Sequence, residues 1–249
     1  MTAFTLRIVA CIAMLIDHIG YACNIQAFRI IGRIAFPIFL FLIYNGYLHT
    51  SCKWRYALRL ALFALISQVP FSLFTGGQLW ISNGNVFVTL LICLLCLWIS
   101  DVLVKQKYLK YFCILPWIIG FGVYYFGIIR SDYGAKAVLM ALCLFLFYGK
   151  AWWKRILLVL STLCAVFYSF GLSCIVYIKD ILFGSPASLS MPGNWALLQV
   201  YSLLAFLFIF AYNGKKGGIL ANNAVNKCIQ YGFYLFYPVH MLLIWWIFG

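Results

Sequence analysis

The sequence predicts an all-α polytopic integral membrane protein, a single bundle of about nine transmembrane helices. Of its 249 residues, 66% are hydrophobic and only 9% are charged, whereas charged residues make up about a quarter of a typical soluble domain. The mean hydropathy is +1.03. Apolar runs long enough to cross a bilayer, about 20 residues each, recur along the whole chain. These observations exclude an ordinary soluble domain.

Nine apolar runs are expected to cross the membrane, and the first is expected to be a span rather than a removed signal peptide, because no cleavage site follows it. The runs lie near residues 4–23, 34–50, 56–74, 86–104, 111–129, 134–149, 155–177, 194–212 and 229–248. The sixth run is short and the seventh long, so their boundaries are expected to shift. No linker, low-complexity tract or internal repeat divides the chain. Residues 1–249 are therefore expected to form one domain.

The positive charges predict the orientation, because Lys and Arg near span ends stay in the cytoplasm. Thirteen of the 18 basic residues fall on one side, namely Arg7, Lys53, Arg55, Arg59, Lys105, Lys107, Lys110, Lys150, Lys154, Arg155, Lys215, Lys216 and Lys227. Arg29, Arg33, Arg130, Lys136 and Lys179 fall on the other. With nine spans, this predicts a cytoplasmic N-terminus and an external C-terminus. Anionic lipid facing these loops explains the net charge of +14 without a nucleic-acid partner.

An acid and an imidazole stand next to each other in the first span. Ionisable residues inside a span are costly and mark a functional site or a buried pair. His18 follows Arg7 by eleven residues, which on a helix places the two on one face, about 16 Å apart along the axis. A long cofactor entering from the cytoplasm would have its charged end at Arg7 and its reactive end near His18. An orientation charge and a packed core histidine explain the same two residues equally well.

Asp17 points about 100° away from His18 around the helix, which argues against a direct contact. Arg33 opens the second span at a similar depth and is the expected partner of Asp17. A purely structural salt bridge explains this pair about as well as a catalytic role does.

Further polar residues are candidates for contacts with a substrate. Gln68 and Asn85 belong to the same outer level, where they would bind an acceptor or form interhelical hydrogen bonds. His240 lies mid-span beside Pro238, and a packed histidine bonded to the irregular backbone is the favoured interpretation. The ten cysteines are scattered through apolar runs, where they are expected to act as small hydrophobes, and no metal site is predicted.

A glycine-rich turn lies on the cytoplasmic side of the eighth run. Asn213-Gly214-Lys215-Lys216 offers backbone amides and two ammonium groups. Such a turn suits a phosphate or nucleotide, and it also suits an ordinary positively charged loop.

Several of these motifs occur together in one order along the chain: residues 14–20, 32–39, 67–71, 85–90, 212–215 and 237–240, with Arg59. In this arrangement the sequence resembles the TraX family over nearly its whole length. The resemblance implies a multi-pass protein of the bacterial cytoplasmic (inner) membrane, of a family named for N-terminal acetylation of pilin. It also implies a relation to transmembrane acyltransferases, in which an Arg, ten residues and a His recur in the first span; Arg7 and His18 match that spacing.

The resemblance implies roles for individual residues. His18 would be the catalytic general base, with Asp17 and Arg33 fixing the charge of the catalytic site. Arg7, Arg59, Asn213, Lys215 and Lys216 would hold the phosphates of acetyl-CoA, the acyl donor. Gln68, Asn85 and His240 would contact the substrate.

The function predicted from these features is transfer of an acetyl group from cytoplasmic acetyl-CoA to an amine or hydroxyl at the outer face. The acceptor is open among a peptide N-terminus, a glycan and a small molecule. One alternative is a proton-coupled transporter or flippase, since intramembrane Asp and His also serve as proton relays. Another is a non-catalytic assembly factor. The expected partners are the donor, the acceptor and membrane lipid.

Overall fold

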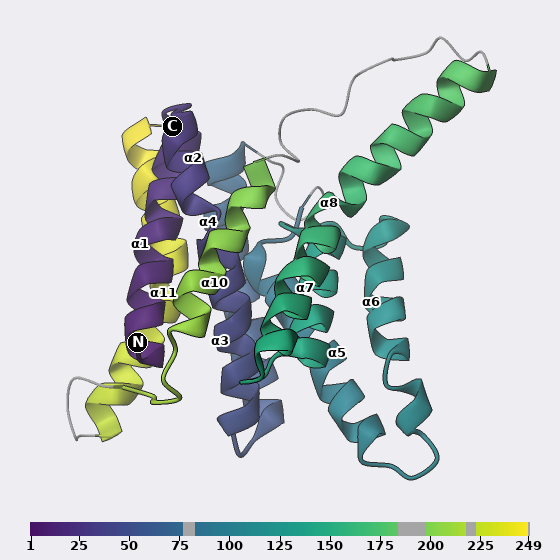
Figure 1. Cartoon of the computed structure of the whole chain (residues 1–249). Coiled ribbons are helices and arrows are strands. Elements are labelled where there is room, and N and C mark those ends of the chain that lie inside the picture. The colour runs from purple at the N-terminus through teal and green to yellow at the C-terminus, as the bar shows by residue number, and fades with distance from the viewer. Residues whose placement is uncertain (77–82, 184–197, 218–222, 249) are drawn as a thin grey trace.

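The computed structural model describes residues 1–76, 83–183, 198–217 and 223–248, and within these segments the named elements are all helices (Figure 1). They are α1 (Ala3–Ala22), α2 (Gln26–Gly32), α3 (Ala35–His49), α4 (Lys53–Thr75), α5 (Val86–Val104), η1 (Lys110–Phe112), α6 (Leu115–Tyr125), α7 (Gly134–Phe147), α8 (Trp152–Phe183), η2 (Gln199–Leu204), α10 (Ala205–Phe210) and α11 (Asn223–Phe248).

Five helical segments of the described chain are long and apolar enough to cross a membrane. They are α1, α2 with α3 as one broken segment, α4, α5, and residues Cys228–Phe248 of α11. Each overlaps one of the predicted runs, those at 4–23, 34–50, 56–74, 86–104 and 229–248. The prediction of a helical protein with several spans of membrane length is confirmed for these segments.

The other four predicted spans agree to different degrees with the helices of the structure. α7, with 14 residues, matches the short sixth span at 134–149 within two residues, α6 has only 11 residues, and η2 with α10 covers Gln199–Phe210 of the eighth span. α8 has 32 residues and continues past the predicted end at 177. Residues 194–197 of the eighth predicted span lie outside the described residues.

The fifth predicted span shows why a helix can be shorter than the apolar run that predicts it. The run at 111–129 is apolar throughout most of its length, yet its first part forms a 3-10 turn and α6 begins only at Leu115, with Pro116 in its first turn. The helix ends before Gly127, whose φ is +68°, a left-handed conformation that suits glycine. The prediction from apolar composition therefore included residues that form turns in the structure.

The chain reverses sharply between α1 and α2. Asn24 adopts a φ of +54°, and the Ile25 N–H donates to the Gly20 carbonyl at 2.8 Å, so that α2 folds back along the end of α1 (Figure 1). Gly32 then lies against Asp17 so closely that a Cβ there would overlap the Asp17 side chain. The absence of a side chain at Gly32 is what allows α2 and α1 to approach at this point.

The predicted sorting of charge is visible in the arrangement of the connections. Figure 1 shows the N-terminus, the connections α3–α4, α5–η1 and α7–α8, and the residues that directly follow α10 toward the same end of the molecule. Backbone hydrogen bonds tie the N-terminus to the segment after α10: the Ala3 N–H donates to the Lys215 carbonyl and the Phe4 N–H to the Lys216 carbonyl. The basic triplets of the sequence belong to this end.

We expect Gly32→Ala to destabilise the fold by about 1–3 kcal/mol, because the added methyl group cannot fit beside Asp17 without moving α2. The melting temperature in detergent, followed by circular dichroism, measures the effect. Gly232→Ala in α11 is the matched control, since a Cβ there meets no atom within 4 Å. Equal melting temperatures for the two variants would contradict the close approach of α2 to α1.

Candidate functional site

Two cavities of similar size lie within the bundle. The first, of about 460 Å³, is lined by Arg7, Arg59 and Lys216, and we call it the basic cavity. The second, of about 440 Å³, is lined by His18 and Asp17 among others, and we call it the histidine cavity. Four residues line both cavities and therefore form a shared wall between them: Met14, Phe39, Val86 and Tyr237.

One face of α1 runs past both cavities. Arg7 lines the basic cavity, Met14 belongs to the shared wall, and His18 lines the histidine cavity. Residues seven and then four positions apart return to nearly the same side of a helix. The predicted common face of Arg7 and His18 is therefore confirmed, and it joins the two cavities.

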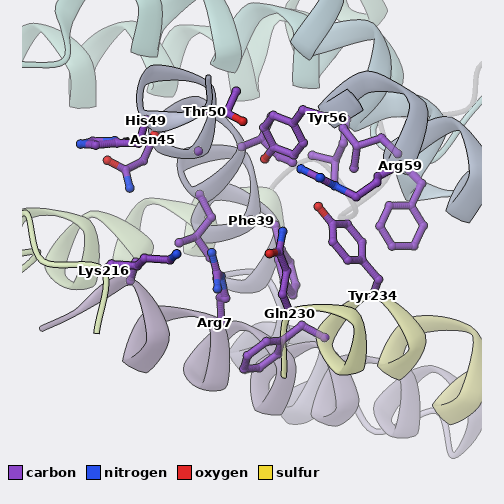
Figure 2. A pocket seen from close by; sticks show the side chains of 18 of the residues that line it. Arg7, Phe39, Asn45, His49, Thr50, Tyr56, Arg59, Lys216, Gln230 and Tyr234 are labelled. Carbon is purple, nitrogen blue, oxygen red and sulfur yellow. Dashed lines mark hydrogen bonds between the residues drawn. The ribbon is translucent and has the colours of Figure 1, made fainter. Parts of the chain in front are cut away.

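The basic cavity combines cations with aromatic rings (Figure 2). The Arg7 guanidinium lies 5.9 Å from the centre of the Phe233 ring, and that of Arg59 lies 5.5 Å from the centre of the Tyr56 ring. Arg59 Nε is buried and has no hydrogen-bond partner among the described residues. A buried donor without a partner is costly, so this nitrogen is suited to an acceptor supplied by a ligand.

Only part of the predicted phosphate-binding turn reaches the basic cavity. Lys216 lines it, whereas Asn213 and Lys215 do not. The Asn213 side chain accepts a hydrogen bond from the Lys215 N–H at 3.0 Å and so stabilises the turn itself. The Lys215 and Lys216 carbonyls accept from the first N–H groups of α1, which have no partner within that helix. The predicted contact of Asn213 and Lys215 with the phosphates of a donor stays a prediction, and the structure places both residues outside the cavity lining.

Three residues that line the basic cavity were not predicted, because nothing in their sequence spacing marks them. His49, Gln230 and Tyr234 line the basic cavity and are labelled in Figure 2. His49 Nδ1 donates to the Asn45 carbonyl at 2.8 Å. They come from α3 and α11, and only the packing of these helices brings them to one site.

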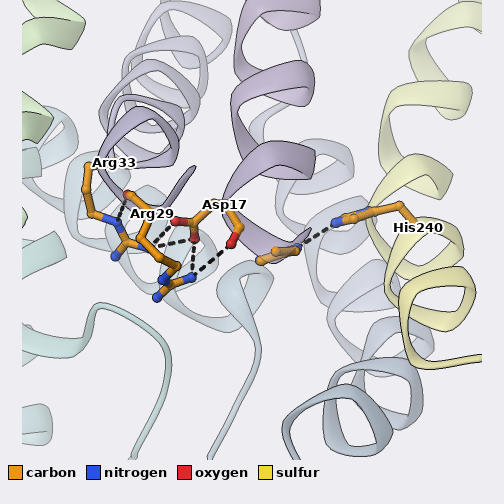
Figure 3. Close-up of polar contacts among 5 residues, drawn as sticks. Asp17, Arg29, Arg33 and His240 are labelled. Carbon is orange, nitrogen blue, oxygen red and sulfur yellow. Dashed lines mark hydrogen bonds and ion pairs between the residues drawn. The ribbon is translucent and has the colours of Figure 1, made fainter. Parts of the chain in front are cut away.

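In the histidine cavity, Asp17 is held by two guanidinium groups (Figure 3). Arg33 Nη2 lies 2.5 Å from Oδ1 and 2.6 Å from Oδ2 of Asp17. Arg29 Nη1 lies 2.8 Å from Oδ2 and also donates to the Asp17 carbonyl at 3.2 Å. The predicted pair of Asp17 with Arg33 is confirmed. Arg29, in α2, is a second cation in contact with Asp17, and this contact was not predicted.

A loop with an unusual backbone conformation also lines this cavity. Tyr133 has a φ of +63°, which is uncommon for a bulky residue and often marks functional sites. Its ring stacks on Phe36, 3.7 Å between centres and 10° between planes. Thr89 Oγ1 donates to the Asp132 carbonyl at 2.5 Å, and the Asp132 N–H donates to the Gly84 carbonyl at 3.0 Å. The loop is therefore fixed to the start of α5, with Asp132 and Tyr133 both lining the cavity.

Gln68 and Asn85, predicted to bind substrate, line neither cavity. Asn85 Oδ1 caps α5 by accepting from the Phe87 N–H at 3.0 Å, and Asn85 Nδ2 donates to the Ala64 carbonyl and to Gln68 Oε1. Gln68 Nε2 donates to the Asn83 carbonyl at 2.9 Å. Their hydrogen-bonding groups join α4 to α5, as the alternative of interhelical hydrogen bonds predicts, and the predicted substrate contact stays untested.

His240 and His18 form a direct contact between α11 and α1. His18 Nδ1 lies 2.7 Å from His240 Nε2, and the two rings are within 3° of coplanar. His240 Nδ1 lies 2.6 Å from the Phe236 carbonyl, which matches the predicted histidine bonded to backbone. His240 is buried and does not line the histidine cavity, whereas His18 does. The structure thus gives His240 a contact to His18, and its predicted contact with substrate stays a prediction.

The described residues contain no group of three or more His, Cys, Asp or Glu side chains placed to hold a metal ion. The side chains that line the two cavities include the imidazoles of His18 and His49, carboxylates, guanidinium and ammonium groups and tyrosine hydroxyls.

The chain is similar to one protein family and to one named protein over nearly its whole length. A family model described as TraX protein matches residues 3–248. The protein named probable fimbrial assembly protein FimC, serogroup H1, of Dichelobacter nodosus is 26% identical over 259 residues, covering 98% of this chain and 94% of that protein. No solved structure gives a significant match.

We expect Asn85→Ala to lower the stability of the protein by about 1–3 kcal/mol, because it removes a helix cap and leaves the Ala64 carbonyl and Gln68 Oε1 without this donor. Thermal unfolding in detergent measures the loss. Asn83→Ala, which keeps the backbone carbonyl bonded by Gln68, should stay within about 0.5 kcal/mol of wild type. A stable Asn85→Ala protein with impaired ligand binding would restore the substrate-binding interpretation.

Proposed function

The chain belongs to the TraX family, and on that premise we propose that it is a membrane-bound acetyltransferase using acetyl-CoA as donor. The observation that carries the proposal is the pair of cavities, one basic and one containing His18, separated only by the shared wall. The basic cavity suits the phosphates of CoA, and the histidine cavity suits an acceptor that must lose a proton.

The proposal includes an orientation in the bacterial cytoplasmic membrane. Because the basic triplets belong to the N-terminal end, we place that end and the basic cavity in the cytoplasm and the C-terminus outside. The histidine cavity then faces the outer half of the membrane. In this arrangement the helices shorter than a full span complete a bundle that crosses the membrane about nine times.

The donor would enter the basic cavity with its phosphates toward the cytoplasm. Arg7, Arg59 and Lys216 supply three cations there, and bonds from such groups to phosphate are strong because both partners are charged. The pantetheine arm would follow the α1 face toward Met14, placing the thioester at the shared wall. Lys215 and Asn213 act on the donor only indirectly, through the turn that positions Lys216.

His18 would act as the general base from the other side of the wall. As the nitrogen or oxygen of the acceptor attacks the thioester carbon, His18 takes the proton that the acceptor loses. The new C–N or C–O bond forms, the C–S bond breaks, and the CoA thiolate receives the proton from His18. The ion pairs of Asp17 with Arg29 and Arg33 keep the carboxylate away from this proton transfer.

Tyr237 is placed to stabilise the negative charge on the thioester oxygen. It lines both cavities, and its hydroxyl oxygen accepts from the Val86 N–H at 3.5 Å. Because that bond uses the oxygen as acceptor, the hydroxyl proton remains available to an oxyanion at the wall.

The acceptor is an amine or hydroxyl presented at the outer face. A peptide N-terminus, a glycan or a small molecule would each provide such a group. The relative from Dichelobacter nodosus is named as a fimbrial assembly protein, which makes a fimbrial subunit the first acceptor to test. Asp132 and the aromatic rings of Phe36, Phe74 and Tyr133 line the cavity where it would bind.

We expect Lys216→Gln to raise the Kd for acetyl-CoA about tenfold, and Arg7→Gln to do the same, because each removes a cation that faces the phosphates. Equilibrium binding to the purified protein in detergent measures this. Lys215→Gln is the matched control: it removes the same charge one residue away, outside the cavity lining, and should change the Kd less than twofold. Equal weakening by both lysine variants would show a general charge effect instead of a site.

We expect His18→Gln to reduce acetyl transfer and the slow hydrolysis of acetyl-CoA by at least a hundredfold while the Kd for acetyl-CoA stays the same. Tyr237→Phe should lower kcat by about a hundredfold, since it removes one oxyanion donor. Turnover is followed by release of free CoA thiol. Retained turnover in His18→Gln would eliminate His18 as the base.

The same preparation distinguishes the alternative functions. Uptake into proteoliposomes that depends on a proton gradient and not on CoA would favour a transporter or flippase. A stable protein partner, with no binding of acetyl-CoA by the folded protein, would favour an assembly factor.

A further inference from the structure

We propose that His240 is a positioning residue that holds the His18 imidazole with its proton on Nδ1, leaving the Nε2 lone pair available to the histidine cavity. The proposal rests on the contact geometry of the two rings. Only its kinetic consequence rests on the proposed function.

The position of each proton follows from what the partner atoms can do. The Phe236 carbonyl can only accept a hydrogen bond, so the proton in its 2.6 Å contact is on His240 Nδ1. A neutral His240 then carries no proton on Nε2, which must accept. The 2.7 Å contact to His18 is therefore made by the Nδ1–H of His18, and a neutral His18 has its lone pair on Nε2.

Burial supports a neutral His240. Its exposed fraction is 3%, and its ring contacts are with Phe236, Tyr237 and His18. A second proton on His240 would create a buried cation without a carboxylate in contact, which is costly. His18 Nε2, by contrast, has no hydrogen-bond partner among the residues that the structure describes, and His18 lines the cavity.

The coplanar arrangement gives His240 two effects on His18. It selects a tautomer that is the less common one for free histidine in water, and it fixes the ring so that Nε2 stays in one place. When His18 Nε2 gains a proton, its Nδ1–H becomes a donor from a charged ring, and the bond to His240 strengthens. His240 thus supports the base without touching the acceptor.

The chain has only three histidines, so the tautomers can be read directly. The full-length protein in detergent, labelled with ¹⁵N-histidine, would give ring-nitrogen NMR shifts that distinguish protonated from unprotonated nitrogen. His49→Gln and His240→Gln assign the signals. We expect wild-type His18 to show a protonated Nδ1 and an unprotonated Nε2, and His240→Leu to move the proton to Nε2. A wild-type His18 with its proton on Nε2 would overturn the proposal, whether or not the His240→Leu protein folds.

Kinetics provide the second measurement. We expect His240→Leu to lower kcat about ten- to a hundredfold with an unchanged KM for acetyl-CoA, a smaller loss than the factor of about 10⁴ that the wrong tautomer causes in a serine protease. His240→Gln keeps an acceptor oxygen and should recover part of kcat. Equal losses in both variants would contradict a positioning role. Protonated Nδ1 in a protein that does not bind acetyl-CoA would support the histidine pair and refute the acetyltransferase proposal.

Discussion

The ion pairs of Asp17 fix the placement of α2 against α1. A carboxylate inside an apolar bundle is stable only when its charge is matched and its oxygens are bonded. Arg29 and Arg33 do both, and they can reach Asp17 only because α2 folds back on α1 and Gly32 has no side chain. α3 begins two residues after Arg33, and its first turns bring Phe36 to the histidine cavity and Phe39 to the shared wall. The ion pairs and the shared wall are therefore joined by one short stretch of chain.

The sequence predicted positions correctly where they depend on the periodicity of one helix or on the pairing of two charges. The periodicity of a helix alone places Arg7 and His18 on one face, and the scarcity of acids left few partners for Arg33. The sequence did not predict contacts that depend on how distant helices pack against each other. His18 and His240 are 222 positions apart, and no spacing rule joins α1 to α11. Lys215 and Lys216 are equivalent in composition, but an irregular turn directs only Lys216 to the cavity.

Polar residues near a predicted site show how one type of side chain suits two roles. Gln68 and Asn85 have the side chains expected of a substrate site, and the same side chains are well suited to closing a loop over helix ends that need caps. In an apolar protein, backbone groups left unpaired at a helix end need a hydrogen-bond partner. Amide side chains that supply this partner therefore lie close to the polar residues of a candidate site. The strained Tyr133, in contrast, has no feature in its sequence that marks it, because its backbone angle is imposed by the contacts of the loop.

If the protein carries out the proposed acetyl transfer, the shared wall has a further consequence for the cell. An enzyme that reacts a cytoplasmic donor with an external acceptor connects two aqueous compartments, and an open path between them would let protons flow and discharge the membrane potential. Met14, Phe39, Val86 and Tyr237 present mostly apolar groups at the junction, where an ion would lose its hydration. A small uncharged acetyl group pays no comparable cost. Under the proposed function, the wall would let an acetyl group pass between donor and acceptor while it opposes the passage of ions.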